Sequence, residues 1–565
     1  MVDDIKWNAF QGEIPKMANR LRPQQYAQSS LNADFRTGNL VALGKSGTTL
    51  TLSTTLMKTI YKMDSSWLYW PGDIDCVKAA VVPTAEKTLT FYTGDGYPKQ
   101  TDLDFMASSG TPDSTADYER LGVIAPTVAL TINFHGTGTG EVINSVGYVY
   151  TYVCERNGIQ HESAPSPPTA VGEGTDVEVG QYVSLTGFVD PVFSSTGNDV
   201  DFYRVYRLAS GSTGAEYQLL SGRPAAYSAA AVTDIPDGTT TVFDNDDPTT
   251  PAALNTPLGE VIATDGFDPP PDDMIGLTEF KNGMLVGFRG KELCVSDSQS
   301  QYAWDENNRI RFDQDIVSVG VYGNSLIVAT DTFPYIVTGS EPGYLMAEIL
   351  PYEQGCLNKN GLVSTRMGVI FPTPDGLFLV NDHQGINLTK NLYTKEQWQA
   401  LDPSTITTAF YDDQIVCFQE NEESGFFIDL DGKSVGPFDT LYDFSGYHII
   451  SEDDTLHFVG ESGGTYYIRS WDDGGVGDLS FTYSTGLVTT GFDTNFPFGR
   501  IYGAQNAELP CTFNLYGDGA LLYSVSIEDE NMFRLPADTR AKDWYVEVVS
   551  KAVIESIELI STRGQ

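Results

Sequence analysis

The chain has few basic residues and no long apolar run. Its 565 residues include 33 Lys and Arg against 76 Asp and Glu, a formal net charge of −43 at pH 7. A surface that grips duplex DNA needs clustered Lys and Arg to displace counterions from the phosphates, so the shortage argues against such a surface. No stretch approaches the roughly 18 apolar residues of a membrane helix, and the first residues lack the pattern of a signal peptide. We therefore expect no membrane anchor.

Cysteine and histidine are also scarce. The six cysteines are scattered and form no CxxC pair: Cys76, Cys154, Cys294, Cys356, Cys417 and Cys511. Without a secretion signal, they are expected to be reduced, buried small hydrophobes, in a protein assembled in a reducing cytosol. None of the five histidines pairs with another at i, i+4, and none lies in an HExxH motif. A catalytic zinc site therefore lacks its usual ligands.

Glycine, proline and aromatic residues are abundant. The chain has 55 Gly and 29 Pro, and aromatic residues make up 12%. Many turns combined with many Tyr and Phe favour short strands over long helices. Dividing the length by about 150 residues gives three to four domains. The predicted fold class is all-β.

The first 125 residues divide into two predicted regions. Residues 1–60 are expected to form an irregular arm with one helix, which begins near Pro23, continues through Leu31 and ends before Gly38. Proline suits the first turn of a helix, and glycine commonly follows its end. Residues 61–125 have short apolar and aromatic runs broken by turns, which predicts a β-rich platform region.

Residues 126–267 have the pattern of a fibronectin-like β-sandwich. Residues 148–153, 202–207 and 241–244 are rich in β-branched and aromatic residues and are predicted to be strands. An acidic, proline-rich linker at 268–273 marks the next boundary.

Residues 268–480 contain a recurring unit of a turn followed by a strand. The turns are Asn282-Gly283, Gly323-Asn324, Asp375-Gly376, Asp412-Asp413 and Asp453-Asp454, at intervals of 41, 52, 37 and 41 residues. A four-stranded propeller blade takes roughly 40–50 residues, so the spacing predicts β-propeller blades, with an insertion in the 52-residue interval. An ordinary meander, in which similar turns recur without a fixed interval, is the alternative.

Two further elements complete the prediction. Thr394 and Gln397 are spaced as a capping box, which predicts a short helix over 394–398. Residues 481–565 return to strands, with a hairpin at 515–519 and alternating strands at 543–549 and 554–559. These last strands are expected to close the propeller or to form a small sandwich.

No enzyme motif survives comparison with a simpler explanation. Gly460, Ser462 and Gly464 match the nucleophile-elbow pattern, but strand-like residues flank both sides, so a hairpin turn is favoured. Gly44-Lys45-Ser46 lacks the spacing of a P-loop. Aspartate clusters at 244–247, 429–432 and 472–474 do not complete a calcium loop and are expected to be solvated turns. We therefore predict a protein that is not an enzyme, with no catalytic, cofactor-binding or metal-binding residues and no cofactor.

Several stretches, in order along the chain, resemble the tail nozzle proteins of short-tailed bacteriophages, also called tail tubular protein B. They are FQGEIP (10–15), LRP (21–23), FRTGNL (35–40), FYTGDGYP (91–98), LGVIAP (121–126), ESAPS (162–166), GFRG (287–290), PYIVTG (334–339), PDGL (374–377), YTKEQW (393–398), FRLP (533–536) and DW (543–544). The resemblance covers nearly the whole chain. Where the family often has serine two residues after the cysteine that matches Cys356, this chain has Asn358, which affects only local packing.

The resemblance implies a structural virion protein of a podovirus-like phage. Members of this family assemble in the host cytoplasm as a cyclic hexamer, dock on the adaptor ring of the virion tail, anchor tail fibres or spikes, and form the distal tube for DNA ejection. Six copies would carry six times −43, or −258, formal charges, which suits a wall that double-stranded DNA passes without tight binding.

Two other functions remain open. The first is a carbohydrate-binding adhesin whose aromatic side chains stack on sugars, with Trp67, Trp70, Trp304 and Trp398 as candidates, although core packing is the commoner use of tryptophan. The second is an all-β glycan-degrading tail enzyme that uses a pair of carboxylates. With 76 acidic residues, the sequence does not single out a pair.

Overall fold

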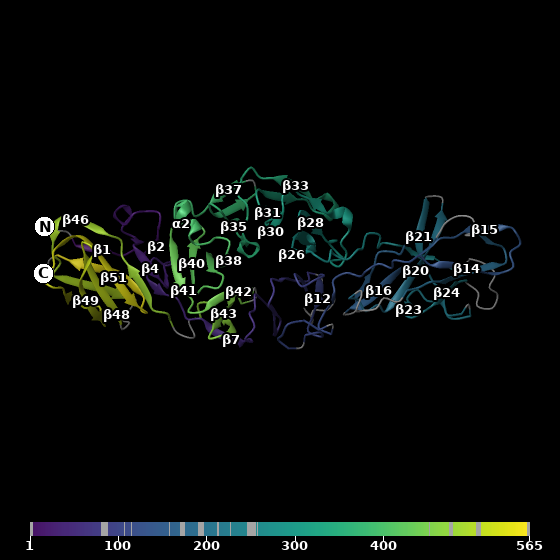
Figure 1. The fold of residues 1–565 in the computed structure, drawn as a ribbon, viewed down its shortest axis with the longest axis horizontal. Helices are drawn as coiled ribbons and strands as arrows, with labels where there is room; N and C mark the ends of the chain where they lie inside the picture. Colours follow the sequence, from purple (N-terminus) through teal and green to yellow (C-terminus); the bar gives the residue numbers. More distant parts are fainter. Residues whose placement is uncertain are drawn as a thin grey trace.

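The protein is elongated, with three β-rich parts arranged end to end (Figure 1). The computed structural model describes residues 4–561 except 81–88, 107, 115, 157–158, 170–175, 190–196, 212–213, 227, 246–255, 257, 383, 451–452, 474–477 and 504–509. A C-terminal β-domain lies at one end together with both chain termini, a ring of sheets lies in the middle, and a β-sandwich lies at the other end. The prediction of an all-β fold with a propeller is confirmed.

Antiparallel four-stranded sheets follow one another through the middle of the chain, as in a β-propeller. The first two blades are β26 (Ile275–Glu279), β27 (Leu285–Arg289), β28 (Glu292–Val295) and β29 (Ile310–Arg311), then β30 (Ile316–Tyr322), β31 (Ser325–Thr330), β32 (Pro334–Thr338) and β33 (Met346–Ile349). The next two are β34 (Val363–Thr365), β35 (Gly368–Thr373), β36 (Gly376–Asn381) and β37 (Gln384–Asn387), then β38 (Ile406–Tyr411), β39 (Gln414–Gln419), β40 (Ser424–Asp429) and β41 (Val435–Asp439). The fifth consists of β42 (Asp443–Ile450), β43 (Thr455–Ser462), β44 (Thr465–Ser470) and, from the N-terminal region, β7 (Gly47–Thr51).

The recurring turns precede equivalent strands in four of the five blades. They come before β27, β31, β39 and β43, each the second strand of its blade, whereas Asp375-Gly376 comes before β36, the third strand. The equivalent turn of that blade is Arg366-Met367, which lies 43 residues after Gly323 and 46 before Asp412. The predicted insertion is therefore wrong. In this blade the Asp-Gly pair stands at the second hairpin turn and Arg-Met at the first, so the turn residues alone did not identify which strand follows.

Residues 61–125 belong to the ring. A hairpin of β8 (Thr59–Met63) and β9 (Ser66–Trp70) contacts β42, and a four-stranded sheet of β10 (Asp75–Lys78), β11 (Thr90–Thr93), β12 (Lys99–Thr101) and β13 (Glu119–Arg120) contacts β26. These strands fill the space between the fifth and first blades. Because β13 precedes the sandwich and β26 follows it, the sandwich is an insertion between two neighbouring sheets of the ring.

The inserted sandwich has two main sheets around an aromatic core. One sheet contains β14 (Thr131–Gly136), β19 (Gln181–Thr186), β24 (Thr241–Asp244) and β22 (Arg223–Pro224). The other contains β17 (Ile159–Glu162), β16 (Tyr148–Arg156), β20 (Phe202–Gly211), β21 (Gly214–Leu220) and β25 (Leu258–Val261), with β23 (Ile235–Pro236) beside β20. A two-stranded sheet of β15 (Val142–Ser145) and β18 (Asp176–Glu178) accompanies them. The three predicted strands correspond to β16, β20 and β24.

A buried ion pair joins the two main sheets of the sandwich. Arg207 Nη1 lies 2.8 Å from Asp244 Oδ2, and the hydroxyls of Tyr148 and Thr256 each donate to Asp244 at 2.7 Å. A buried carboxylate needs such partners, because removing it from water is costly. Asp244 therefore has a structural role, and the other part of its cluster, 246–247, lies outside the described residues.

The C-terminal β-domain also contains two sheets. One is formed by β1 (Ile5–Trp7), β52 (Ile554–Ile560), β47 (Phe498–Gly503) and β50 (Phe533–Arg534). The other is formed by β4 (Ser29–Leu31), β45 (Phe481–Ser484), β51 (Ala541–Ser550), β48 (Cys511–Gly517) and β49 (Ala520–Ile527), with β46 (Val488–Thr494) pairing β51. The predicted hairpin is β48–β49, whose turn residues Asp518 and Gly519 both have positive φ. The two predicted alternating strands correspond to β51 and β52.

The helix predicted from Pro23 to Leu31 is wrong. These residues form β3 (Tyr26–Ala27) and β4, and only a 3-10 turn, η1 (Asn19–Leu21), precedes them. A single short helical face is marginal by itself, whereas each strand here gains a partner. Strand β3 joins the nearby β2 (Gln11–Glu13), and β4 joins β45 from the far end of the chain. The first 60 residues are not an irregular arm, because β1, β2, β4 and β7 all pair with strands from the second half of the chain, and β5 (Ala33–Asp34) pairs β6 (Val41–Ala42).

Arg22 organises this N-terminal region. Its guanidinium donates to the carbonyls of Ile14 at 2.9 Å, Met17 at 3.0 Å and Gln28 at 3.1 Å, and also to that of Ala27. The planar fork of five donors suits an arginine for satisfying several carbonyls at once. The side chain thereby holds together two chain segments on either side of it.

The predicted capped helix is confirmed as α2 (Lys395–Gln399). The Thr394 side chain accepts from the Gln397 backbone N–H at 3.2 Å, and the Gln397 side chain accepts from the Thr394 N–H at 2.9 Å. Trp398 is buried and donates to the Thr373 carbonyl at 2.8 Å. Other helical turns are short: η2 (Lys281–Gly283), η3 (Glu306–Asn308), η4 (Pro342–Tyr344) and η5 (Lys359–Gly361). Across the described ranges, no helix has the length and apolar character needed to span a membrane.

Candidate functional site: the central cavity of the propeller

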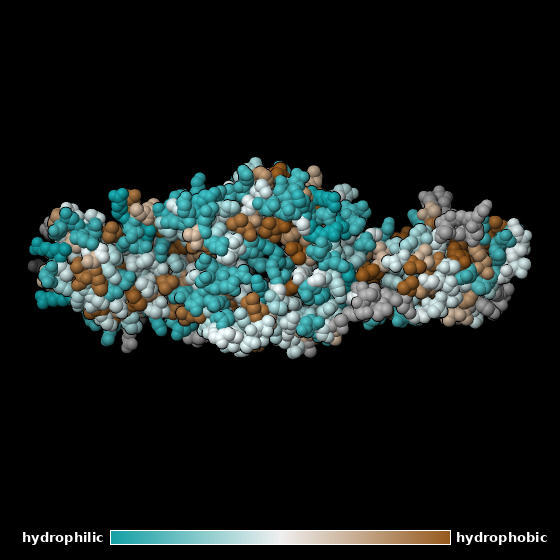
Figure 2. All heavy atoms as spheres, in the orientation of Figure 1, coloured by the Kyte–Doolittle hydropathy of each residue, from teal (hydrophilic) through white to brown (hydrophobic). Residues whose placement is uncertain are grey.

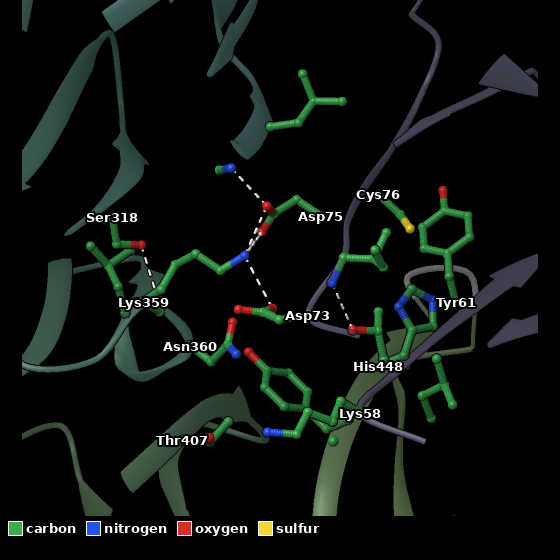
Figure 3. Close-up of a pocket in the computed structure, with 18 of the residues that line it drawn as sticks. Lys58, Tyr61, Asp73, Asp75, Cys76, Ser318, Lys359, Asn360, Thr407 and His448 are labelled. Atoms are coloured by element: carbon green, nitrogen blue, oxygen red, sulfur yellow. Dashed lines mark hydrogen bonds and ion pairs between the residues drawn. The ribbon is translucent and has the colours of Figure 1, made fainter. Parts of the chain in front are cut away.

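A cavity of about 360 Å³ lies where the inner elements of the ring meet. Residues from β8, β10, β26, β30, β38 and β42 line it, together with η5, the 3-10 turn that precedes the β34–β37 sheet. Figure 3 shows side chains from these separate elements pointing toward one another. The cavity is the bore of the propeller.

Lys359 crosses the cavity to two carboxylates. Its ammonium nitrogen lies 2.8 Å from each Asp75 carboxylate oxygen and 3.1 Å from Asp73 Oδ1 (Figure 3). The Gly276 N–H donates to Asp75 at 2.7 Å. Three elements of the ring, η5, β10 and β26, therefore meet at one carboxylate. We call Lys359, Asp73 and Asp75 the axial cluster.

Burial and charge act in opposite directions on Lys359. Burial lowers the pKa of its ammonium, but the carboxylates of Asp75 and Asp73 outweigh that effect and hold the pKa above its ordinary value. Burial also raises the pKa of Asp75. Lys359 thus remains a cation with all three of its donors engaged. The axial cluster is therefore better suited to holding η5 and β10 together than to proton transfer.

A histidine and aromatic side chains form another wall of the cavity. The ring centroid of His448, on β42, lies 4.9 Å from that of Tyr61 and 6.2 Å from that of Trp67, and Trp67 lies 5.1 Å from His457. Burial, and secondarily the neighbouring His457, lowers the pKa of His448 to about 4. His448 is therefore neutral near pH 7 and packs as an aromatic ring between the β8–β9 hairpin and the fifth blade.

Cys76 contributes a thiol to the cavity wall. Burial, and secondarily the charge of Asp75, raises its pKa well above the ordinary value. Because the thiolate is the nucleophilic form, this thiol is poorly suited to covalent chemistry. The other five cysteines are buried, as predicted.

The candidate motifs lie away from this cavity. Ser462 of the GxSxG match ends β43, and β44 follows directly, so the motif is a hairpin turn, as predicted. Gly44 donates to the side chain of Asp472, which places two rejected motifs against each other in a structural contact. His383 lies outside the described residues, and no group of three or more possible metal ligands occurs among those described.

The tryptophans proposed as sugar-stacking platforms are all buried. Trp67, Trp70, Trp304 and Trp398 have exposed fractions of 4%, 2%, 1% and 1%. A platform for a sugar ring must present an open face, so these four residues do not form one in this chain.

No sequence pattern indicates the axial cluster. Lys359 and Asp75 are 284 residues apart in the chain, and neither belongs to a motif with fixed spacing. The only local signal is the pair of carboxylates in Asp73-Ile74-Asp75, which resembles many acidic turns of this chain. Only closure of the ring brings the three groups together.

Comparison with known proteins gives likenesses of fold alone. No family model and no curated protein matches the sequence. Among solved structures, Raptor of Chaetomium thermophilum has a TM-score of 0.28 and 9% identity over 76% of this chain and 29% of its own. PorZ of Porphyromonas gingivalis has a TM-score of 0.27 and 12% identity over 80% and 64%. The WD40 domain of Neurospora crassa Pan2 has a TM-score of 0.26 and 7% identity over 51% and 85%. Such low scores carry no argument about function.

Proposed function

We propose that this chain is the tail nozzle protein of a podovirus-like phage, a structural component of the virion tail rather than an enzyme. Six copies would form the distal tube, dock on the adaptor ring and anchor tail fibres or spikes. The observation that carries this proposal is the ordered set of stretches, from Phe10 to Trp544, that resemble the nozzle family.

The cavity geometry supports a tube formed between copies. The axial cluster spans the central cavity of the propeller, which has a volume of about 360 Å³, and the Lys359 ammonium contacts Asp75 and Asp73 across it. A DNA duplex cannot pass through a space of that size. A conduit built from this chain therefore has to lie between protomers, as in a ring.

The charge balance supports passage without tight binding. The Asp and Glu residues outnumber Lys and Arg by 43, and several of the basic residues are held in ion pairs, such as Arg207 with Asp244 and Arg204 with Glu162. A protein binds DNA strongly when its Lys and Arg side chains neutralise phosphates and release the condensed counterions. A tube wall with few unpaired Lys and Arg side chains would bind the duplex weakly and let it move.

The decisive experiment is imaging and mass measurement of the purified chain. We expect hollow six-membered rings by negative stain and native mass spectrometry, either alone or after addition of the adaptor protein. We also expect no duplex binding at 150 mM salt, checked against a basic DNA-binding protein as a positive control. A chain that stays monomeric beside its adaptor, or that retains duplex at this salt, would contradict the proposal.

The alternative functions predict different results. An adhesin would bind particular glycans on an array as a monomer, and a glycan-degrading enzyme would release sugars from capsule or peptidoglycan. Turnover lost after replacement of one carboxylate would favour the enzyme over the nozzle protein.

A further inference from the structure

The larger sheet of the C-terminal β-domain has β49 as its outer strand on one side, and β4 and β46 as its outer strands on the other. Strand β51 pairs with β48 on one side and with β45 and β46 on the other, and β49 continues the sheet beyond β48. Within the described residues, β49 pairs only with β48, and β46 pairs only with β51. Figure 1 shows β46 and β49 on opposite margins of this domain.

Strand β49 lacks the features that usually protect an outer strand. Its eight residues, ALLYSVSI, contain no charged residue and no proline. Soluble proteins usually protect sheet edges with short strands, charges or proline. Some outer strands of this chain follow that pattern, such as β13 (Glu-Arg) and β33, which has four residues including a glutamate. The outer strands β7 and β14 also lack charge and proline, but they are shorter than β49, with five and six residues. A bulge at Leu522 interrupts the pairing, but the five residues from Tyr523 to Ile527 pair regularly with β48.

Strand β46, on the opposite edge, carries an exposed aromatic side chain. Between Thr489 and Thr494 its pairing with β51 is irregular, and Phe492 in this segment is 60% exposed. At the other edge, Leu521 of β49 is 54% exposed. Figure 2 shows apolar surface over the C-terminal domain among hydrophilic residues. Aromatic side chains in such positions commonly anchor protein interfaces.

The low charge of these edges favours a second copy as the partner. Two chains of −43 repel each other, so copies can approach closely only where the surface carries little charge. The β49 edge is uncharged, and β46 carries a single charged residue, Asp493, whose carboxylate lies 3.9 Å from the Lys542 ammonium. A partner attracted by charge would instead choose the acidic surface that covers much of this molecule.

We infer that β49 of one copy docks against β46 of the next, so that Phe492 packs beside Leu521 and the sheets join around the ring. The two edges are different surfaces, so the contact is head-to-tail, the type that closes into rings. This inference rests on the proposed function and specifies the contact that would assemble the tube.

The test uses full-length variants at exposed positions. Phe492→Asp blocks one edge, and the double variant Leu521→Asp with Ser524→Asp blocks the other. Leu441→Asp is the matched control, because Leu441 is 52% exposed and lies in the propeller. Thermal melts and circular dichroism verify that each variant folds. Native mass spectrometry is run at a concentration at which the wild-type chain is fully assembled. If the wild-type chain needs the adaptor to assemble, the adaptor is added to every sample.

We expect each edge variant alone to lose rings by more than tenfold and the Leu441 control to retain them. Mixing the two edge variants should give dimers. The Phe492 variant keeps an intact β49 edge and the double variant keeps an intact β46 edge, so one contact can form between them. Rings that persist in either edge variant would overturn this inference while leaving the nozzle proposal intact. Variants that remain monomers when mixed would show that β46 and β49 do not meet. A wild-type chain that never forms rings would overturn both proposals.

Discussion

At the scale of single residues, Lys359 shows how one cation can tie a ring together. Its ammonium joins η5 to β10, and Asp75 in turn accepts from Gly276 on β26. These contacts link the sheet that precedes the inserted sandwich with blades that follow it. The ion pair between Lys359 and Asp75 thus holds the ring together at its centre, and the pairing of β7 with β44 does so at its outer edge.

Replacing Lys359 with methionine should destabilise the propeller. The variant leaves Asp75 partly buried without its cation, and removing one partner of such a pair costs about 3 kcal/mol. Urea denaturation followed by tryptophan fluorescence measures the loss. Lys433→Met is the control, because Lys433 and Asp431 form an exposed pair; it should give no measurable change. Equal effects of the two variants would contradict a role of Lys359 in holding η5 and β10 together.

His448 should make stability depend on pH. Its pKa is about 4 in the folded chain, against an ordinary value of 6.5. Between these values the unfolded chain binds the proton and the folded chain does not, so stability falls as pH drops from 6.5 toward 4, by roughly 3 kcal/mol. Thermal melts across this range should show a shallower dependence in His448→Asn. Ser445→Ala, which removes a hydrogen bond to Met57 from the same strand, should retain the wild-type slope.

At the scale of elements, the N-terminal strands complete sheets whose other members come from the end of the chain. Strand β1 pairs with β52, and β7 adds the outer strand of the fifth blade. These N-terminal strands therefore pair within their own chain and do not form a free arm. Loss of these strands would leave sheet edges and core side chains open to water.

Truncating Trp7 to alanine should destabilise the C-terminal domain. Trp7 is buried in its core and donates to the Gly486 carbonyl at 3.0 Å. Large-to-small core changes of this kind cost about 3–5 kcal/mol. Limited proteolysis should show faster cleavage within residues 481–561. In contrast, Lys6→Ala removes a half-exposed ion pair with Glu558 and a contact with the Tyr502 ring, and it should change cleavage little.

At the scale of the whole molecule, net charge should control assembly. Copies that each carry −43 repel one another over distances set by salt, because the Debye length is about 30 Å at 0.01 M and about 8 Å at 0.15 M. We therefore expect rings to dissociate at 10 mM salt and to persist at 150 mM, measured by mass photometry. Sucrose at matched osmolality should not preserve the rings at 10 mM salt, because sucrose does not screen charge. Rings that are insensitive to salt would mean that apolar contacts outweigh the repulsion.

Local pattern was sufficient for much of the fold. The capping box at Thr394, the hairpin turn at Asp518-Gly519 and the strands at 148–153 and 241–244 depend on turn chemistry, side-chain period and β-branched content within a few residues. The all-β class followed from the same signals. The helix expected after Pro23 did not form, because β2 nearby and β45 hundreds of residues away each pair with a strand from that segment.

Local sequence thus determined many of the strands and turns, because these depend on neighbouring residues. Composition determined the acidic character of the chain, because net charge depends only on how many residues of each type are present. Tertiary structure alone decided that residues 61–125 close the ring, that the sandwich is an insertion, and that Lys359 meets Asp75 across the bore. Those outcomes depend on which distant strands pair and on the burial that follows, and neither is encoded in any local spacing.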